Sequence, residues 1–525
     1  MSELAVRVGG EPTPVPAARS IRGYTAAVAR SRAGAGIGSL LGDVYYAGVM
    51  IGVGVLLALG ALQQLPVRDA PVAVEGSTSL AGLAAVLMVA VVGAVLGTAG
   101  RLGPIGVGGA EATWWLTLPV DRRGLLRGSV WRLPALAALV TGLVAGVLAA
   151  VVPAVGNPAQ VGLMGALAAA TLVITAALVQ AWRGSRVAVV AGDVLLATVP
   201  VLGAGAVLAG WHPATVPAVP WWTLAPAVLA LTGLVWWLDT RLGAIPARSL
   251  RESGSVAAHA AGALTSMDSR ELGRALTDRT ARQSRRRSLR MRLSGGAVRA
   301  LLTADLLVLL RSPRHLVQIV AGALLPYLVV STPELAGPAQ LALAVLIGGY
   351  LATQATGEAA RRAEMTPAVD RLLPLSARDV RRAHLVVPAT VMTLWAVVAL
   401  AAVGIWHGEF WPWLVLALVA GPAWAGGALR SAYRPAPSWD KALVSTPMGA
   451  VPMGAAAVLA RGPDVVIVGQ LPALVAVLVG SVPPSVLGVQ VATTVVALLW
   501  GSSTETRSLM DRLAEAQDAT STPRR

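Results

Sequence analysis

Residues 80–100 read LAGLAAVLMVAVVGAVLGTAG and contain no charged side chain. One helix needs about 20 apolar residues to cross a bilayer core about 30 Å thick, so this stretch predicts a membrane span. Similar runs recur along the chain of 525 residues, of which 55% are hydrophobic and 13% are charged. Soluble domains carry about 25% charged residues. The sequence therefore predicts an all-α, polytopic membrane protein.

Twelve spans are expected, arranged as two six-helix halves that extend over residues 44–238 and 300–501. The first-half spans are expected at residues 44–62, 80–100, 133–152, 161–181, 187–209 and 221–238. The second-half spans are expected at residues 316–330, 335–353, 385–405, 411–429, 443–459 and 486–500. The other segments are an N-terminal part (1–43) that ends in an interfacial helix, a basic linker (239–299) and a polar tail (502–525).

One apolar stretch, residues 465–482, does not fit this count. Pro472 interrupts it, and Pro483 and Pro484 follow. Backbone that is not helical is tolerated at membrane depth where protein or water shields it. We therefore expect a re-entrant hairpin here. The alternative is that residues 465–482 form a full span and that residues 444–461 lie at the membrane interface.

The net charge of +16 comes almost entirely from arginine. Arginines gather in the loops at residues 101–132 and 183–186, whereas residues 63–79 and 153–160 carry few cations. Because cationic loops stay in the cytoplasm, this alternation predicts that both termini are cytoplasmic. The arginine-rich linker is expected to lie near anionic lipid, and a docking surface for a cytoplasmic partner is the alternative.

Two loops repeat one pattern. Residues 118–127 read LPVDRRGLLR, and residues 373–382 read LPLSARDVRR. Both loops follow the second span of their half, so they predict a parallel duplication of a six-span unit. The polar landmarks that coincide between the halves are Arg123 with Arg378, Arg127 with Arg382, Asp43 with Asp305 and Asp193 with Asp440.

No catalytic or metal-ligating constellation is visible in the sequence, so we do not expect an enzyme. The five histidines lack zinc-ligand spacing, cysteine is absent, and no phosphate-binding loop of the form G-x-x-x-x-G-K-[ST] occurs. Acids inside a span are functional candidates by default, and we single out Asp193 and Glu358. The alternative for Asp193 is a helix-end carboxylate beside Arg183 and Arg186.

The two Leu-Pro loops carry the candidate site. Pro favours the first turn of a helix, and arginines four residues apart share one helix face. We expect in each loop a short arginine-rich helix that docks into an ATPase, and an interfacial helix with snorkelling arginines is the alternative. The candidate coupling residues are Pro119, Asp121, Arg122, Arg123, Arg127, Pro374, Arg378, Asp379 and Arg382.

On these loops, the sequence resembles the permease subunit of ABC-2 type exporters, which has a coupling helix between its second and third spans. Residues 305–313, DLLVLLRSP, are similar to the elbow helix that precedes the first span of that family. The resemblance gives Asp43, Asp305 and Arg311 as elbow residues. A re-entrant hairpin between the fifth and sixth spans is a feature of the same family. The chain is similar in particular to fused, twelve-span permeases of actinobacterial type.

The resemblance implies an exporter in the bacterial plasma membrane that works by alternating access. Its substrate would be hydrophobic or amphipathic, such as a drug, an antibiotic or a lipid. A separate ATPase, in two copies that match the two loops, would bind ATP and Mg²⁺. This chain would bind no cofactor itself and would have no nucleic-acid partner.

Two other functions fit the sequence. A major-facilitator-type secondary transporter also has twelve spans, and residues 121–124, DRRG, are similar to part of its loop between spans two and three. That signature needs two further cations after the glycine, where Leu125 and Leu126 stand. A membrane enzyme or scaffold is the other alternative, and the lack of an acid–histidine cluster argues against an enzyme.

Overall fold

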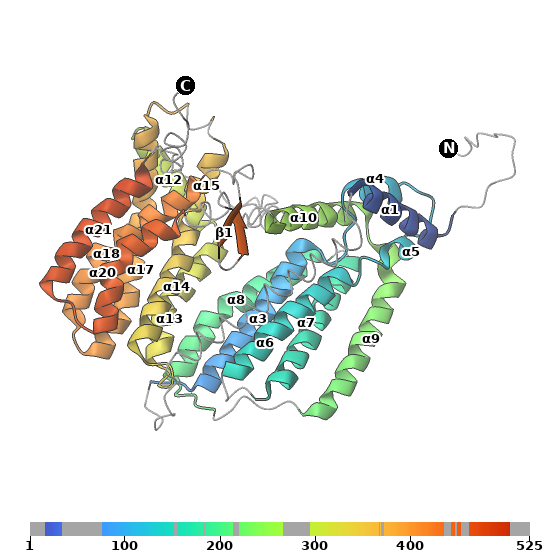
Figure 1. Ribbon diagram of the computed structural model, residues 1–525, viewed down its shortest axis with the longest axis horizontal. Helices are drawn as coiled ribbons and strands as arrows, with labels where there is room; N and C mark the ends of the chain where they lie inside the picture. The colour runs from blue at the N-terminus through green and yellow to red at the C-terminus, as the bar shows by residue number, and fades with distance from the viewer. Residues whose placement is uncertain are drawn as a thin grey trace.

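The computed structural model describes residues 16–33, 76–151, 156–182, 184–213, 220–265, 295–366, 368, 372–434, 443–446, 449–452 and 461–503. Over these residues the protein is helical, apart from one hairpin of two short strands (Figure 1). Ten of the described helices are long and apolar enough to cross a membrane, and α20 (Pro463–Val479) is a shorter apolar helix. The prediction of an all-α, polytopic membrane protein is confirmed.

The first half contains five described helices of membrane-spanning length. They are α3 (Leu80–Leu102), α6 (Arg132–Val151), α7 (Pro158–Ala181), α8 (Ser185–Leu208) and α9 (Leu224–Arg241). Shorter or amphipathic helices accompany them: α1 (Ala18–Ala33), α4 (Gly109–Trp115), α5 (Arg122–Leu126) and α10 (Ala247–Thr265). The first expected span, residues 44–62, lies outside the described residues.

The described residues of the second half contain five helices of membrane-spanning length and the shorter apolar helix α20. They are α13 (Pro313–Val330), α14 (Pro338–Thr356), α17 (Ala377–His407), α18 (Phe410–Ala432), α20 and α21 (Pro484–Ser502). Two further helices are α12 (Ala297–Leu310) and α15 (Glu358–Met365). The strands are β1 (Leu443–Thr446) and β2 (Gly449–Pro452).

Local sequence determines where several of these helices begin and end. Ser79 caps α3, because its side chain accepts a hydrogen bond from the backbone N–H of Gly82 at 3.2 Å. Such a cap satisfies one of the N–H groups that the first turn of a helix leaves free. Gly408 ends α17 and Gly480 ends α20, and both glycines have left-handed backbone angles. Residues with a Cβ disfavour this conformation, so glycine is common directly after a helix.

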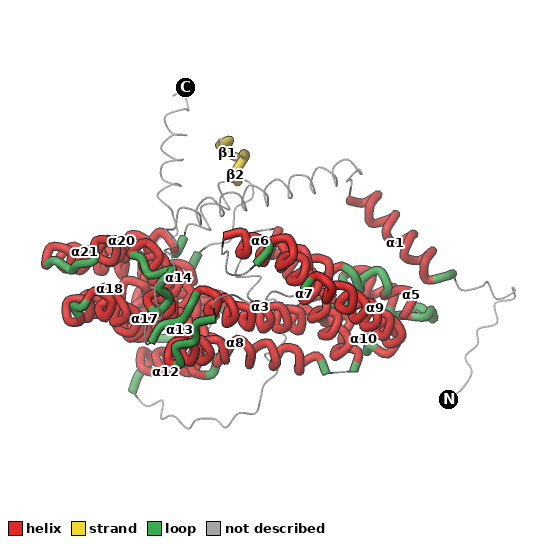
Figure 2. Tube along the Cα trace, turned by 90° about the horizontal axis from the view of Figure 1, so that it is seen from below, coloured by secondary structure: helices red, strands yellow, loops and turns green. Residues whose placement is uncertain are grey.

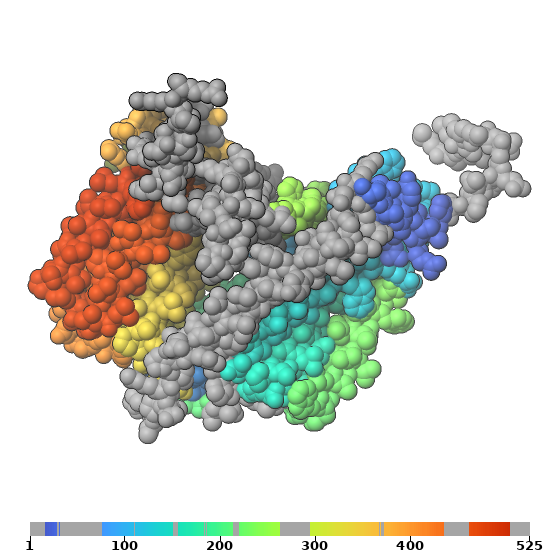
Figure 3. Space-filling view, viewed as in Figure 1, coloured from blue at the N-terminus to red at the C-terminus, as the bar shows by residue number. Residues whose placement is uncertain are grey.

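The spans run between two ends of the molecule (Figure 1). The end that we term the arginine end carries the segments after α3 and α14, the starts of α8 and α13, and α10. The opposite end, which we term the far end, carries the connections from α8 to α9, α13 to α14, α17 to α18 and α20 to α21. Figures 2 and 3 show the halves side by side, and α8 packs against α13 where they meet.

Three of the contacts between helices of the first half recur between the helices at equivalent places in the second half. The contact of α6 with α7 recurs as that of α17 with α18, and each is the most extensive contact in its half. The contacts of α3 with α8 and of α7 with α9 recur as those of α14 with α20 and of α18 with α21. Other contacts differ, since α20 packs on α21 and α14 packs on α17, whereas α8 with α9 and α3 with α6 make little or no contact. The duplication of a six-span unit therefore stays a prediction.

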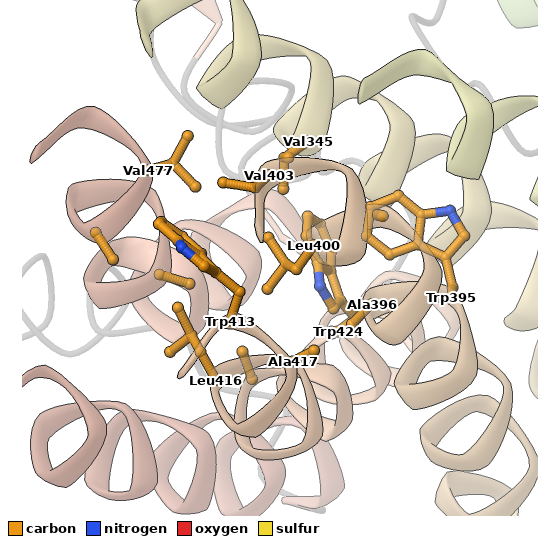
Figure 4. Close-up of a cluster of buried hydrophobic side chains, with 14 of the residues drawn as sticks. Val345, Trp395, Ala396, Leu400, Val403, Trp413, Leu416, Ala417, Trp424 and Val477 are labelled. Carbon is orange, nitrogen blue, oxygen red and sulfur yellow. The ribbon is translucent and has the colours of Figure 1, made fainter. Parts of the chain in front are cut away.

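The largest hydrophobic core lies among α14, α17, α18 and α20 of the second half (Figure 4). Trp413 and Trp424 of α18 are fully buried there. The Trp424 ring meets Trp395 edge-on, with 5.6 Å between centroids and 72° between planes. Such an aromatic pair adds about 0.5–1.5 kcal/mol to the stability of the fold, beyond the contribution of the buried surface area. Gly349 of α14 makes room for Trp424, since a Cβ at that glycine would lie 2.3 Å from the ring.

The expected re-entrant hairpin at residues 465–482 is wrong. Residues Pro463–Val479 form one continuous helix, α20. Gly462, directly before α20, lies against Ser431 near the end of α18, and Gly480, directly after it, lies against the ring of His407 at the end of α17. Since α18 ends at the arginine end and α17 ends at the far end, α20 connects the two ends as a full span.

Pro472 lies inside α20 without ending the helix. Proline normally removes a backbone hydrogen bond and disturbs the preceding turn. Here the buried side-chain amide of Gln490, on α21, accepts a hydrogen bond from the N–H of Ala473 and donates one to the carbonyl of Gly469. A neighbouring helix therefore satisfies the backbone groups beside the proline.

The expected span at residues 443–459 is also wrong. This segment contains β1 and β2, which pair antiparallel with Val444 opposite Val451. Its β-branched residues favour strands, and Pro447 and Pro452 would each interrupt a helix. With α20 as the fifth span of the second half, the expected number of spans in that half is unchanged.

Candidate functional site

The first Leu-Pro loop, residues 118–127, forms the short helix that the sequence predicts. Pro119 is exposed and precedes the helix, and Asp121 caps α5 by accepting a hydrogen bond from the backbone N–H of Arg123 at 3.0 Å. Leu125 and Leu126 are buried beneath it. Arg122 lies in the first turn and makes no ion pair with the described residues.

Two arginines of this loop bind one carboxylate of α9. The Nε of Arg123 donates to Asp239 Oδ2 at 3.0 Å, and the Nε of Arg127 donates to Asp239 Oδ1 at 2.8 Å. The carboxylate raises the pKa of Arg127 above its ordinary value by accepting this bond. Arg123 and Arg127 therefore share one helix face, as predicted, and that face is joined to the last span of the half.

Sequence reasoning missed Asp239 as the partner of these arginines. The residue lies 112 positions after Arg127, so no local spacing connects them. The one available signal was a single acid, two residues after Trp237, at the end of an uncharged span. Such an acid at the arginine end needs a cation close by.

The second Leu-Pro loop, residues 373–382, does not form a separate short helix, and that part of the prediction is wrong. Ser376 caps α17 by accepting a hydrogen bond from the N–H of Asp379 at 3.2 Å, and its hydroxyl donates to the Asp379 carboxylate at 2.6 Å. From there α17 continues without a break to His407. The first loop has Gly124 and Gly128, which weaken a helix by about 1 kcal/mol each, and the second has no glycine there.

The arginines of the second loop are used differently. Arg381 donates to the carbonyl oxygen of Ser503 at the end of α21, and its guanidinium lies 4.4 Å from the centre of the Tyr433 ring. Arg378 and Arg382 are exposed and make no ion pair with the described residues. Pro374 is exposed as well. An arginine thus joins this loop to the last span of its half too, and two further arginines face outward.

A helix outside the spans packs against the loop segment of each half. In the first half, α1 packs on α5. Ala18 of α1 lies so close to Gly124 of α5 that a Cβ on Gly124 would not fit. In the second half, α12 packs on α15 and α17. Asp305 of α12 is buried and its Oδ2 lies 2.7 Å from Nδ1 of His384, which is also buried. Arg311 is exposed at the end of α12.

Asp43, the elbow residue expected in the first half, lies outside the described residues. His384, in contrast, was not among the expected site residues. Its partner Asp305 comes from a helix that precedes α17 by several elements, so the sequence offers no spacing that would connect them.

The two acids expected inside the membrane lie close to the boundary between the halves. Asp193 of α8 forms an ion pair with Arg101, which is buried near the end of α3. Glu358 begins α15 at the arginine end and pairs with Arg362 at 2.9 Å and with Arg361 at 3.3 Å. Burial lowers the pKa of Arg361, although Glu358 opposes that shift. Glu358 is therefore outside the spans, and Asp193 is within one.

Arg314 lies at the same end, as the second residue of α13. The sequence analysis did not select this arginine.

An apolar cavity of about 730 Å³, largely open to the outside, lies between the far-end parts of α3 and α8. Its walls are mainly Ala, Val and Leu, with Trp211 and His212 at the far end. Nearer the arginine end the same two helices touch at Gly97 and Gly192, where a Cβ on Gly192 would lie 2.5 Å from the Cα of Gly97. The helices therefore meet closely at one end and separate at the other. Within the described chain, no three His, Asp or Glu side chains converge on a metal site.

Comparison with known proteins gives one relationship. Neither the curated proteins nor the solved structures contain a match. A family model described as DUF6297, a family of unknown function, matches residues 74–442. The match begins just before α3, ends just after α18 and covers more than half of the chain. The chain belongs to the family DUF6297.

Proposed function

We propose that this protein is the permease subunit of an ATP-driven exporter, working with a separate ATPase that docks on the arginine end. In this proposal the ATPase binds ATP and Mg²⁺, and the two Leu-Pro loops receive its movement. The membrane is the bacterial plasma membrane, and the arginine end faces the cytoplasm, as expected for loops rich in cations.

One observation carries the proposal: each Leu-Pro loop is exposed at the arginine end and is joined to the last span of its own half. In the first half the link runs from Arg123 and Arg127 to Asp239. In the second half it runs from Arg381 to the Ser503 carbonyl. Both halves thus link the Leu-Pro loop to the last span, although they use different residues. A loop that only anchored the protein in lipid would not need such a link to a span.

The exposed surface of the second loop fits a protein partner. The side chain of Leu372 is 84% exposed directly before the Leu-Pro pair. Beside it, Arg378 and Arg382 are exposed cations on consecutive turns of α17. An exposed apolar side chain next to cations that lack an ion pair with the described residues is typical of a docking surface. A partner with an acidic rim around an apolar pocket would match it.

The cavity between α3 and α8 supports a hydrophobic or amphipathic cargo. Its volume of about 730 Å³ falls in the range of small-molecule sites, about 300–1,000 Å³. Its wall is apolar apart from a few groups at the far end, such as His212, which lies 3.1 Å from the hydroxyl of Ser77. A drug, an antibiotic or a lipid with one polar end would suit such a wall.

Reconstitution tests the proposal. The first observation is whether a neighbouring gene encodes a P-loop ATPase. The chain would then be co-expressed with that ATPase, purified, and placed in lipid vesicles. We expect the two proteins to co-purify and the permease to change the rate of ATP hydrolysis. Uptake of a fluorescent hydrophobic dye into inverted vesicles should require ATP. Transport driven by a proton gradient in vesicles that contain this chain alone would contradict the proposal and favour a secondary transporter.

A further inference from the structure

Two backbone N–H groups of the first half bind the second half at the far end. The N–H of Thr78, before α3, donates to the carbonyl of Ser331, after α13, at 2.8 Å. The N–H of Leu80, the first residue of α3, donates to the Glu334 carboxylate, before α14, at 3.2 Å. The far ends of α8 and α13 lie side by side here (Figure 1). We term residues 77–80 the strap, because they hold the two halves together at this end.

The hydroxyl groups of the strap bind the first half instead. All three of them contact residues 211–213, directly after α8. The pairs are Ser77 with the His212 ring at 3.1 Å, Thr78 with the Trp211 carbonyl at 2.8 Å, and Ser79 with the Pro213 carbonyl at 2.7 Å. Residues 211–213 also line the far end of the apolar cavity between α3 and α8. The strap therefore connects the cavity wall to the junction between the halves.

Thr78 makes both connections at once. This residue is buried, and its hydroxyl binds the Trp211 carbonyl while its N–H binds the Ser331 carbonyl. Both Thr78 and Trp211 are packed tightly on the first turn of α3. A Cβ on Gly82 would lie 2.6 Å from Thr78 Oγ1 and 3.3 Å from the Trp211 ring. The Trp211 side chain is 45% exposed, so a molecule in the cavity can reach it.

We propose that the strap couples the cavity to the junction between the halves. When Trp211 is displaced from α3, Thr78 moves with it. The bonds to Ser331 and Glu334 are then lost, and the halves separate at the far end. Hydrogen bonds weaken steeply when their length or angle changes, so a shift of the strap by about 1 Å is sufficient.

This coupling gives an apolar molecule a way to open the far end. A molecule that takes the place of the Trp211 ring on α3 fits the separated state better than the joined state, so its binding favours separation. In the proposed exporter, a hydrophobic cargo in the cavity would thus open the route for its own release. That role rests on the proposed function, whereas the coupling itself needs no ATPase.

One added methyl group imitates the displacement. In Gly82→Ala the new Cβ would lie too close to Thr78 Oγ1, so the strap and Trp211 must shift. Residue 82 itself makes these contacts only within the first half. The matched control is Gly205→Ala, which adds a methyl group to the wall of the same cavity, where a Cβ has nothing within 4 Å.

A second variant cuts one bond of the strap. Leu80→Pro removes the N–H that donates to Glu334, and proline is favoured at the first position of a helix, so α3 should persist. Leu80→Ala is its control, because it also shortens the side chain but keeps the N–H. Coupling between two sites is reciprocal, so cutting this bond should loosen residues 209–212 as well.

Distances between spin labels measure the separation of the halves. The chain has no cysteine, so introduced cysteines are labelled without background. The pair Leu208→Cys with Ala339→Cys reports the far end, where both positions are exposed. The pair Val187→Cys with Leu310→Cys reports the arginine end, where both are exposed as well. The full chain would be measured in lipid nanodiscs without any ATPase or substrate.

We expect Gly82→Ala and Leu80→Pro to shift the far-end distances to longer values, and the two alanine controls to leave them unchanged. The arginine-end distances should not lengthen in any variant. Hydrogen exchange, followed by mass spectrometry, should become faster at the amides of residues 209–212 in Leu80→Pro than in Leu80→Ala. This second measurement keeps the coupling testable if Gly82→Ala does not fold.

Four outcomes would overturn the coupling. They are unchanged far-end distances in Gly82→Ala, an equal shift in Gly205→Ala, equal lengthening at both ends, or equal exchange of residues 209–212 in the two variants of Leu80. None of these outcomes bears on an ATPase, because no ATPase is present. The coupling and the proposed function can therefore fail separately.

Discussion

Gln490 and Ala473 lie on neighbouring helices, and the side-chain oxygen of Gln490 accepts a hydrogen bond from the backbone N–H of Ala473 at 3.0 Å. The amide nitrogen of the same side chain donates to the Gly469 carbonyl at 2.7 Å. In an unbroken helix, Ala473 would donate to Gly469 directly. One glutamine amide is therefore inserted into the helix ladder of α20 next to Pro472.

Replacing this glutamine should destabilise the second half. Gln490→Leu leaves the Ala473 N–H and the Gly469 carbonyl buried without a partner. Each such group costs about 1–3 kcal/mol, so the free energy of unfolding should fall by about 2–6 kcal/mol. The measurement is an unfolding titration in detergent, followed by tryptophan fluorescence.

The control restores the helix ladder. Pro472→Ala should let α20 form its own bond between Ala473 and Gly469, so Gln490→Leu should cost much less in that background. If the two substitutions were additive, the glutamine would not act through the proline.

Asp239 should hold α5 in place. Asp239→Asn removes the charge that Arg123 and Arg127 share, so the amides of residues 122–127 should exchange hydrogen faster. The arginine side chains are 40% and 54% exposed, so we expect a change in stability of only about 1 kcal/mol or less. The effect should shrink at high salt. Glu252→Gln, which breaks the exposed pair of Glu252 with Arg248 on α10, is the matched control and should leave exchange in α5 unaltered.

Gly349 and Gly233 should respond to alanine with opposite signs. A Cβ on Gly349 would meet the Trp424 ring at 2.3 Å, whereas a Cβ on Gly233 of α9 has nothing within 4 Å. Overpacking costs about 1–3 kcal/mol, so Gly349→Ala should lower the melting temperature. Gly233→Ala should raise it slightly, because alanine favours a helix by about 1 kcal/mol. Equal effects would mean that the contact with Trp424 is unimportant.

The second Leu-Pro loop should dominate the electrostatic part of ATPase docking. Arg378→Glu with Arg382→Glu should weaken co-purification with the ATPase at least tenfold and should reduce its dependence on salt. Arg299→Glu, at the same end, is the control. Arg123→Glu should instead disturb α5 through Asp239, so hydrogen exchange there should distinguish the two loops. If the variant of Arg378 and Arg382 docked as well as the unaltered protein, the loop would be an interfacial segment and not a docking site.

The spans were predictable where the sequence was uncharged over a whole membrane thickness. Residues 80–100 became α3 and residues 161–181 became most of α7, because burial in lipid requires both length and apolarity. The errors lie where apolarity and helix preference disagree. Residues 443–459 are apolar enough for a span, yet prolines and β-branched residues favour the strands found there. In α20, Pro472 led to the wrong prediction of a broken helix, because the side chain that satisfies the backbone beside it, Gln490, lies on another helix.

The candidate site was predictable at the level of residues but not of partners. The caps Asp121 and Ser376 occupy corresponding positions in the two loops, and a local pattern can show this. Asp239 and His384 could not be assigned, because each meets its partner through tertiary packing between segments far apart in the chain.

The uninterrupted course of α17 gives the two loops different mechanics. At about 1.5 Å per residue, its 31 residues form a rod about 46 Å long, which begins at Ser376 and ends beside the far-end glycine Gly408. If an ATPase docks as proposed, movement of the second loop would reach the far end through this one helix, in which Pro388 removes one backbone hydrogen bond. Movement of the first loop would reach α6 along the chain and α9 through the ion pairs of Asp239 with Arg123 and Arg127. Because exposed ion pairs weaken at high salt, salt would loosen the link of the first loop to α9 and leave the path along α17 intact.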